Sequence, residues 1–361
     1  MSDQTTLQPR QGVLTNARTV ESLWYTRCPI PTASSLAIDY GWLDEEFADD
    51  GISIASLRAS TDRKVRESHF DHLLPDSFRQ GGNIPPIWTR SRGEDVMLIG
   101  LTWVNEYQAI VTLPETGIRT VGDLRGRRIG LPKRVNDQID FFRVMCLRGI
   151  LTALAFEGMD ENDVELVDLA VEETYLGADD ATHTGTLWAG GHRARRQHAD
   201  AFALIRGEVD AIYTAGAAGA HLAAFMGARE VVEFGSHPDL LVRTGNETPT
   251  ALTVSGALLR ERPDLVARYL KRLLQAARWA EDHPQEAALV VASDVAAPLD
   301  WVEPAYGPDF HKKFAPDLRD DWIAGLESQK DFLLKWGLIE RDFDIREWID
   351  PEPLEMARAA L

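Results

Sequence analysis

Residues 122–131 read Gly-Asp-Leu-Arg-Gly-Arg-Arg-Ile-Gly-Leu, and this stretch decides the fold class. It predicts a short capped helix, a tight turn at a glycine and then a buried strand, which together open an α/β unit. A long helix is expected over 138–157, with strands at 164–167 and 209–213. Because strands alternate with helices, the pattern favours parallel sheets covered by helices.

The chain on both sides of this unit predicts a second α/β unit. Short apolar runs at 96–101 and 108–113 are typical of buried parallel strands, and residues 61–80 read as a charged helix. A further strand begins at Ala251. Amphipathic helices are then expected at 262–282, 284–293 and 318–336.

A unit that is interrupted and later resumed predicts two lobes with a central cleft. We expect lobe I to comprise residues 1–113 and 246–361, and lobe II to comprise residues 114–245. In such sheets, ligands bind beyond the carboxyl ends of the strands. The fold class predicted is therefore α/β, with two lobes around one binding cleft.

The composition of the 361 residues limits the partners of this chain. A net charge of −19 argues against nucleic acid or an anionic membrane surface, although a local basic pocket can still bind a small anion. No run approaches about 18 apolar residues, so no transmembrane helix is expected. The first ten residues lack the basic and apolar regions of a signal peptide, so we expect a cytoplasmic protein with reduced thiols.

Cys28 is the residue that says most about function. It lies in the segment Trp-Tyr-Thr-Arg-Cys-Pro-Ile-Pro at 24–31, whose prolines favour extended backbone. From Thr32 the chain reads as a helix cap and a short helix that stops at Gly41. Cys28 is thus predicted at a strand end facing a helix N-terminus, where N–H groups favour thiolate and bind anions. The alternative is a small buried hydrophobic residue.

Several motifs resemble those of a known family. The pattern Asp-Leu-x-Gly-Arg-Arg-Ile-Gly at 123–130, followed by Gly-Glu-Val-Asp-Ala at 207–211, resembles the type 2 periplasmic binding-protein fold of sulfonate- and nitrate-binding proteins. Within that fold the chain resembles the aromatic sulfinate desulfinases. It shares their Tyr-x-x-Cys-Pro-x-Pro at 25–31, His-Phe at 69–70 and Arg-x-Gly-Gly-x-Ile-Pro-Pro at 79–86. The likeness covers nearly all of the chain beyond residue 20.

The resemblance implies a catalytic site and its substrate. Cys28 would be the essential thiol, His69 would tune it, and Arg79 would clamp the sulfinate oxygens, to which Gly82 would present a backbone N–H. His72 lies three residues from His69 and competes for its role. The implied reaction is cleavage of the C–S bond of 2′-hydroxybiphenyl-2-sulfinate or a related aryl sulfinate, with release of sulfite. The thiol would either protonate the ring carbon or attack the sulfur.

Two other functions are compatible with the same sequence. A non-catalytic solute-binding protein for an organosulfonate or similar anion is the main alternative, and a decarboxylase or related C–C lyase is a third. No phosphate-binding or dinucleotide motif stands in the right context, and no cofactor is expected. His183, His192 and His198 lack metal-ligand spacing, so no metal is expected, and we expect a monomer.

Two features indicate how the pocket differs from those of the family. Residues 131–138 do not match the desulfinase pattern, and small residues occupy 215–220, where bulkier ones are expected. A differently shaped apolar wall is therefore predicted, so the aryl group can differ while the chemistry is kept. Cys146, within the apolar helix at 138–157, is predicted to lie in the core.

Overall fold

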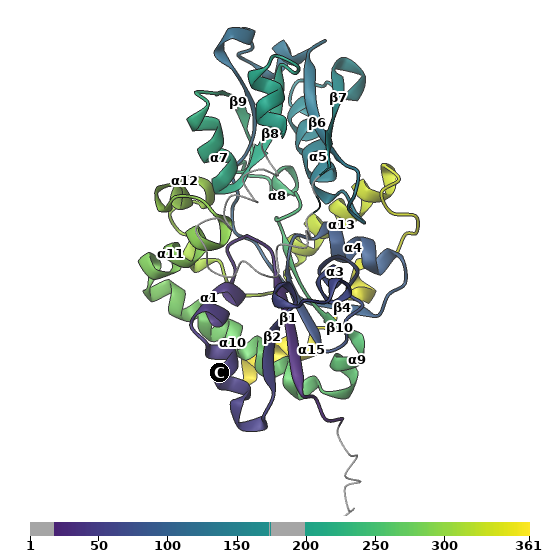
Figure 1. Cartoon of the computed structure of the whole chain (residues 1–361), viewed down its shortest axis with the longest axis vertical. Helices are drawn as coiled ribbons and strands as arrows, with labels where there is room; N and C mark the ends of the chain where they lie inside the picture. Colours follow the sequence, from purple (N-terminus) through teal and green to yellow (C-terminus); the bar gives the residue numbers. More distant parts are fainter. Residues whose placement is uncertain (1–17, 173, 175–198) are drawn as a thin grey trace, which may run out of the picture.

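The computed structural model describes residues 18–172, 174 and 199–361. They form two lobes stacked along the long axis of the molecule, each built around a five-stranded sheet with helices packed against it (Figure 1). The two-lobed α/β architecture expected from the sequence is thus confirmed. His183, His192 and His198, which were not expected to bind a metal, lie outside the described residues.

The sheet of lobe I has the strand order β2-β1-β3-β10-β4. Its strands are β1 (Ser22–Arg27), β2 (Ser53–Ser56), β3 (Ser77–Gly81), β4 (Val96–Thr102) and β10 (Thr250–Ser255). Strand β1 is parallel to β2 and β3, but β10 runs antiparallel between β3 and β4. The prediction of a parallel β4 is wrong, because its partner β10 enters directly from the other lobe and not through a crossover helix.

The sheet of lobe II has the order β7-β6-β8-β5-β9. Its strands are β5 (Gln108–Thr112), β6 (Arg128–Arg134), β7 (Glu165–Val171), β8 (Ala211–Ala215) and β9 (Arg229–Glu233). Strand β6 is parallel to β7 and β8, whereas β5 is antiparallel to β8 and β9. Since β5 lies in this sheet, the chain changes lobe between β4 and β5, ahead of the boundary expected at residue 113.

The charged helix expected over 61–80 is much shorter. Helix α3 (Arg63–Asp71) begins at its cap Asp62, which accepts a hydrogen bond from Lys64 N, and it ends at His72 in the left-handed conformation. Pro75 follows, and proline cannot continue a helix. The remainder of the segment forms β3, all of whose residues are buried. Arg79 therefore lies on a central strand and not at a helix end.

Helices cover both sheets. In lobe I and between the lobes they are α1 (Ala33–Asp39), α2 (Trp42–Phe47), α3, α4 (Ile84–Ser91), α8 (Leu240–Arg243), α9 (Gly256–Glu261), α10 (Pro263–Asp282), α11 (Pro284–Val295), α12 (Val302–Tyr306), α13 (Asp320–Lys335), α14 (Ile345–Trp348) and α15 (Glu352–Ala359). In lobe II they include α5 (Phe141–Ala155) and α7 (Gly216–Phe225). The helices expected at 138–157, 262–282, 284–293 and 318–336 are confirmed.

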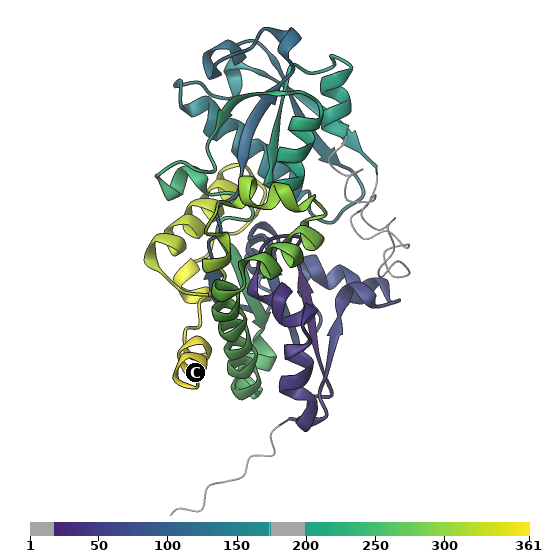
Figure 2. The same ribbon diagram turned by 90° about the vertical axis from the view of Figure 1, so that its left-hand side faces the viewer.

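Helix α10 anchors the core of lobe I, and Figure 2 shows it along the length of that lobe. Leu265, Tyr269 and Leu273 recur at the spacing that places them on one face, and each is at most 2% exposed. The Tyr269 ring stacks on Phe78 of β3 with centroids 3.8 Å apart. The same helix packs against α1 and α15. This core fixes β1, which ends directly before Cys28, and β3, which ends at Gly81.

The chain crosses between the lobes twice, through residues 103–107 and 234–249. Asn83 ties the second crossing to lobe I: its N–H donates to Asn246 O at 2.7 Å, and its Nδ2 donates to Gly245 O at 2.8 Å and Pro249 O at 2.9 Å. Because Asn83 directly follows the Gly-Gly turn, this crossing lies beside the end of β3.

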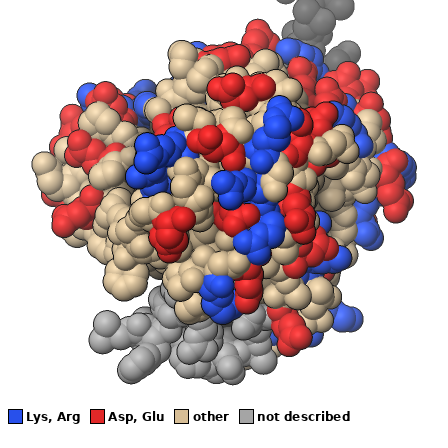
Figure 3. Space-filling view, turned by 90° about the horizontal axis from the view of Figure 1, so that it is seen from above, with Lys and Arg blue, Asp and Glu red and all other residues tan. Residues whose placement is uncertain are grey.

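The described surface carries acidic and basic side chains interspersed, as the view from above shows (Figure 3). Within residues 18–172, 174 and 199–361, none of the helices combines the length and the apolar character needed to cross a membrane.

Candidate active site

Cys28 lies directly after β1 and is 9% exposed. Its N–H donates to Gln80 O at 3.0 Å, which continues the pairing of β1 with β3 beyond the last strand residue. Thr32 then caps α1 by accepting a hydrogen bond from Ser35 N. The strand end and the following helix predicted around Cys28 are therefore confirmed.

The N-terminus of α1 is less open to an anion than the sequence suggested. Ser34 N donates to Gln80 Oε1 at 3.3 Å, and Ser35 N donates to Thr32 Oγ1 at 3.3 Å. Protein groups thus already accept from two of the first N–H groups of this short helix. The polar groups that face the thiol come instead from other elements.

His69 and Arg79 meet at the sulfur of Cys28. The distance from Cys28 Sγ to His69 Nε2 is 3.8 Å, and Arg79 Nη2 donates to the same sulfur at 3.4 Å. On its other side, His69 Nδ1 lies 2.7 Å from Thr26 Oγ1, which orients the ring. Three elements, the end of β1, helix α3 and strand β3, therefore bring the predicted thiol, imidazole and guanidinium together.

Arg79 is held rigidly beside the thiol. It is 2% exposed, and its Nε donates to His69 O at 3.1 Å while Nη1 donates to Gly82 O at 2.8 Å. The planar guanidinium thus donates to groups of three residues, His69, Cys28 and Gly82. A buried cation at this distance favours negative charge on the sulfur or on a bound anion.

Each of the two glycines after Gln80 leaves room for a neighbouring side chain, and the backbone N–H role predicted for Gly82 stays a prediction. A Cβ built on Gly82 would lie 2.3 Å from Asn246 Nδ2, so the missing side chain leaves room for Asn246. A Cβ built on Gly81 would lie 2.3 Å from Cys28 Sγ. The glycine that makes room for the thiol is therefore Gly81, which the sequence reasoning passed over although it stands in the same Gly-Gly motif.

His72, the competitor of His69, does not contact the thiol. Its Nδ1 lies 3.1 Å from Thr89 Oγ1, and the residue is buried. Burial, together with the positive charge of Arg79, lowers the pKa of His72 well below 6.5. A neutral imidazole directed toward Thr89 is placed to stabilise the end of α3, and His69 is the imidazole at the sulfur.

A cavity of about 470 Å³ adjoins Cys28. Its wall begins with Pro29 and Ile30, the two residues after the thiol, and apolar side chains of α5 and the start of α7 form most of the rest. The small residues predicted to reshape the wall do line it, namely Ala215, Gly216, Ala217 and Ala218. Cys146 faces away into the core with no exposed surface, and burial raises its pKa well above 9.0.

A larger hollow of about 850 Å³ lies elsewhere, lined by charged residues such as Arg243, Lys313 and Arg358. Neither Cys28 nor the residues that follow it line this hollow, whereas the apolar cavity is lined by Pro29 and Ile30, the two residues directly after Cys28. The apolar cavity beside the thiol is therefore the candidate active site.

The chain is similar to several known proteins. Residues 85–201 match a family model described as NMT1/THI5 like. The chain is 28% identical over 352 residues to the 2′-hydroxybiphenyl-2-sulfinate desulfinases of Rhodococcus erythropolis and Rhodococcus qingshengii, an alignment that spans 92% of this chain and 92% of each relative.

Solved structures extend the comparison to the fold. The desulfurization enzyme DSZB, solved as a cysteine-to-serine mutant with biphenyl-2-sulfinic acid, is 26% identical with a TM-score of 0.74, covering 94% of this chain and 99% of that one. The aliphatic sulphonate binding protein SsuA from Escherichia coli is 16% identical with a TM-score of 0.63, covering 92% and 93%, which is a likeness of fold alone. The expected periplasmic binding-protein-like fold is thus confirmed. Over nearly its whole length the chain is thus similar to the 2′-hydroxybiphenyl-2-sulfinate desulfinases, and it has the two-lobed fold that periplasmic sulfonate-binding proteins share.

Proposed function

We propose that this protein is a desulfinase that cleaves the C–S bond of an aromatic sulfinate, such as 2′-hydroxybiphenyl-2-sulfinate, and releases sulfite. The observation that carries the proposal is the contact of Arg79 and His69 with the sulfur of Cys28 beside an apolar cavity. The homologous desulfinases and the sulfinic acid bound to DSZB support the choice of substrate class. A protein that only binds an anion has no need of a thiol at this point.

The reaction replaces the C–S bond by a C–H bond. In one route the thiol of Cys28 delivers its proton to the ring carbon, and the electron pair of the C–S bond passes into the new C–H bond. Sulfur dioxide then leaves and adds water to become hydrogen sulfite. Water returns a proton to the thiolate, and His69 Nε2 is placed to carry it.

In the other route the thiolate attacks the sulfur of the sulfinate. An S–S bond forms as the C–S bond breaks, and the departing aryl carbanion takes up a proton. Water then cleaves the adduct to hydrogen sulfite and the free thiol. Both routes require charge on the sulfinate to be balanced near Cys28, and Arg79 is the guanidinium that lies there.

The apolar cavity supplies the rest of the specificity. Phe141, Phe142 and Met145 of α5 line one side, and an aromatic ring that leaves water for such a wall gains roughly 25 cal/mol per Å² of apolar area buried. The sulfinate at the Arg79 end and the ring in the cavity would orient the C–S bond at the thiol.

Sulfite release from 2′-hydroxybiphenyl-2-sulfinate tests the proposal. Wild-type protein is expected to release sulfite and Cys28→Ser is not, because serine cannot supply the thiol. Cys146→Ala is the matched control, since the other cysteine lies in the core and should retain turnover. Equal activity of wild type and Cys28→Ser would remove Cys28 from the mechanism.

The second candidate is a solute-binding protein for an organosulfonate, which the likeness of fold to SsuA favours. Tight binding of a sulfonate, with no turnover of a panel of aryl sulfinates, would select it. We further propose that the enzyme acts as a hydrolase-type desulfinase in the cytoplasm, as a monomer without metal or organic cofactor. Cell fractionation, light scattering and activity after dialysis against a chelator test these points.

A further inference from the structure

The hollow of about 850 Å³ is lined by basic side chains, although the protein carries a net charge of −19. Trp103 and Asn105 of the first crossing line it, together with Arg243 of helix α8 in the second crossing. Lobe I supplies the rest of the wall, from the end of α10 and from residues within 312–322 and 358–361. No described residue lines both this hollow and the cavity beside Cys28, so the two are separate.

Three of the basic side chains on the wall are neutralised by carboxylates. Their ion pairs, each 2.7 or 2.8 Å long, are Arg358–Asp317, Arg319–Asp321 and Lys312–Asp309. The three others, Arg243, Arg278 and Lys313, form no ion pair with any residue that the structure describes. Glu281 is the remaining acid on the described wall. The hollow therefore has an excess of positive charge that no carboxylate balances.

Arg243 is held in place without a partner for its charge. Its Nη1 donates to Asn105 Oδ1 at 3.0 Å, and its Cζ lies 5.8 Å from the centroid of the Trp103 ring. Within residues 18–172, 174 and 199–361, neither its buried Nε nor its Nη2 finds an acceptor. Burial lowers the pKa of Arg243, although the charges of Asp239 and Glu233 oppose this effect. A fixed guanidinium with unused donors is suited to bind an oxyanion.

Lys313 brings a second positive charge to the same place. It follows the turn Phe310–Lys312, and its ammonium has no hydrogen bond or ion pair with the described part of the chain. Burial lowers the pKa of Lys313, and the positive charge of Arg243 lowers it further, so the two cations lie close enough to repel each other. Asp309 opposes this effect, but it is already paired with Lys312. Two partly buried like charges without a counter-ion are unfavourable, and a bound anion would remove that cost.

Trp103 adds an independent sign that the wall is completed by a ligand. The residue is 4% exposed, and its indole Nε1 has no hydrogen-bond partner among the residues that the structure describes. The other edge of the indole faces α13, because a Cβ built on Gly325 would lie 2.9 Å from Trp103 Cζ3. A buried indole N–H normally finds a partner, and here the described protein supplies none.

We propose that this hollow binds a small, doubly charged oxyanion, a phosphate or sulfate group, with Arg243 and Lys313 as its main ligands. A free oxyanion and the phosphate of an ester share this chemistry, and the volume of the hollow leaves room for either. Nucleic acid is disfavoured by the net charge of −19. An anion held by both cations would join α8 in the second crossing to lobe I. Neither the proposal nor its test depends on the desulfinase reaction.

Calorimetry of the wild-type protein with inorganic phosphate tests the site, at an ionic strength held constant with chloride. Saturable binding of about one phosphate per chain is expected, with a dissociation constant on the order of 1 mM or below. Phenyl phosphate is the second probe: tighter binding than that of phosphate assigns the site to an ester, and equal binding assigns it to the free oxyanion. No saturable binding of either probe overturns the proposal.

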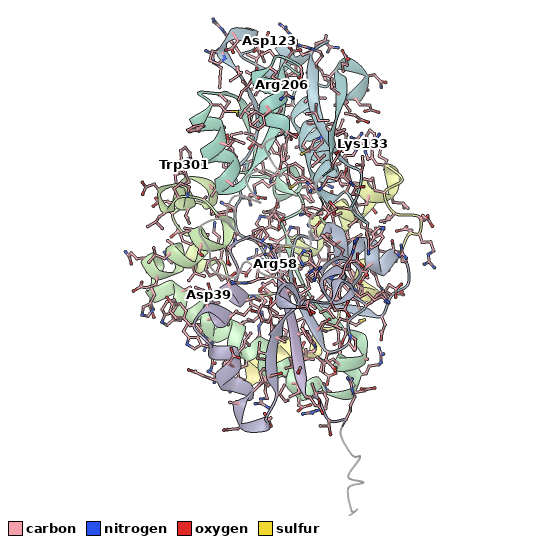
Figure 4. All side chains as sticks on the ribbon, in the orientation of Figure 1. Asp39, Arg58, Asp123, Lys133, Arg206 and Trp301 are labelled. Atoms are coloured by element: carbon pink, nitrogen blue, oxygen red, sulfur yellow. The ribbon has the colours of Figure 1, made fainter. Side chains whose placement is uncertain are left out.

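Variants then locate the binding. Arg243→Met should weaken phosphate binding roughly tenfold to a hundredfold, the effect of losing a charge-assisted hydrogen bond, and Lys313→Met should weaken it about tenfold. The matched controls are Arg206→Met and Lys133→Met, whose basic side chains belong to lobe II (Figure 4) and pair with Glu208 and Asp168.

Phosphate can also bind at Arg79 in the candidate active site. Wild-type affinity in both Arg243→Met and Lys313→Met would assign the phosphate to a place other than the hollow and overturn the proposal.

Thermal unfolding gives a readout that a merely structural role of Lys313 would not produce. In chloride, Lys313→Met should melt at or above the temperature of wild type, because a repelled charge without a partner is removed. Phosphate should raise the melting temperature of wild type and raise that of Lys313→Met less. If Arg243→Met does not fold because its contact with Trp103 is lost, this comparison and calorimetry of Lys313→Met decide. An equal gain from phosphate in wild type and Lys313→Met would overturn the proposal.

Discussion

Gly81→Ala tests directly whether the position of the Cys28 thiol controls the reaction. The added Cβ would lie 2.3 Å from Cys28 Sγ, 2.9 Å from Cys28 Cβ and 3.3 Å from Arg79 Nη1. Non-bonded atoms of this kind settle at about 3.5 Å or more, so the sulfur must move by roughly 1 Å. Both Gly81 and Cys28 sit at ends of paired strands, so the backbone can yield little and the thiol must change its rotamer.

The displacement is expected to lower both the folding stability and the turnover number. Overpacking of a rigid site of this kind costs about 1 to 3 kcal/mol of folding stability. A misplacement of about 1 Å at the reacting atom lowers turnover about a hundredfold. The expected result is therefore a protein that folds with a reduced melting temperature and has a kcat about a hundredfold below that of wild type.

The assay measures sulfite release from 2′-hydroxybiphenyl-2-sulfinate together with the rate at which iodoacetamide alkylates Cys28. Cys146 does not interfere because it has no exposed surface. Gly122→Ala is the matched control, since a Cβ there meets nothing closer than 3.8 Å. A Gly81→Ala protein with the kcat and the alkylation rate of wild type would refute the reasoning. Either the thiol would not have moved, or its movement would not affect the reaction.

Two further substitutions test the guanidinium clamp and a buried acid. Arg79→Lys should lower kcat/KM about tenfold to a hundredfold, because one ammonium cannot replace the bonds that Arg79 makes to His69, Gly82 and Cys28. Steady-state kinetics measure the effect, with Arg63→Lys at an exposed position as the control. An equal fall of kcat/KM in both variants would contradict the prediction. Burial, with the charge of Asp140, raises the pKa of Asp200 from 3.8 to about 7, so its stabilising contribution is complete below about pH 4 and is lost as the pH rises through 7. As the pH rises from 5 to 8, the free energy of unfolding of Asp200→Asn in urea should therefore increase relative to that of wild type by on the order of 3 kcal/mol. A difference between the two proteins that does not change with pH would exclude this effect.

The long periodic elements could be predicted from the sequence because their signals are local. Helices α5, α10 and α13 appear where the apolar spacing places them, and the break after Cys28 follows from its flanking prolines and the cap at Thr32. The proximity of Cys28, His69, Arg79 and Gly82 was expected from the resemblance to the desulfinases, and the structure brings all four together.

Other features of the site were not readable from the sequence, for identifiable reasons. Residues 61–80 are rich in helix-forming charged residues, yet burial against α10 makes β3 a strand, which overrides local propensity. His69 and His72 lie at a spacing that shares a helix face, so only the left-handed turn at His72 separates their roles. In the Gly-Gly pair, only the packing shows that Gly81 faces the thiol.

The sequence by itself determined the two-lobed α/β class, the strand end at Cys28 and the chemistry that a thiol, an imidazole and a guanidinium can perform, because each rests on residue type and short spacing. Only the tertiary structure decided which imidazole meets the sulfur, which glycine makes room for it, and that Arg243 and Lys313 line one hollow. Those two cations lie far apart along the chain, and they meet because the second crossing between the lobes passes beside lobe I. A contact of that kind depends on how the lobes pack, which no local pattern encodes.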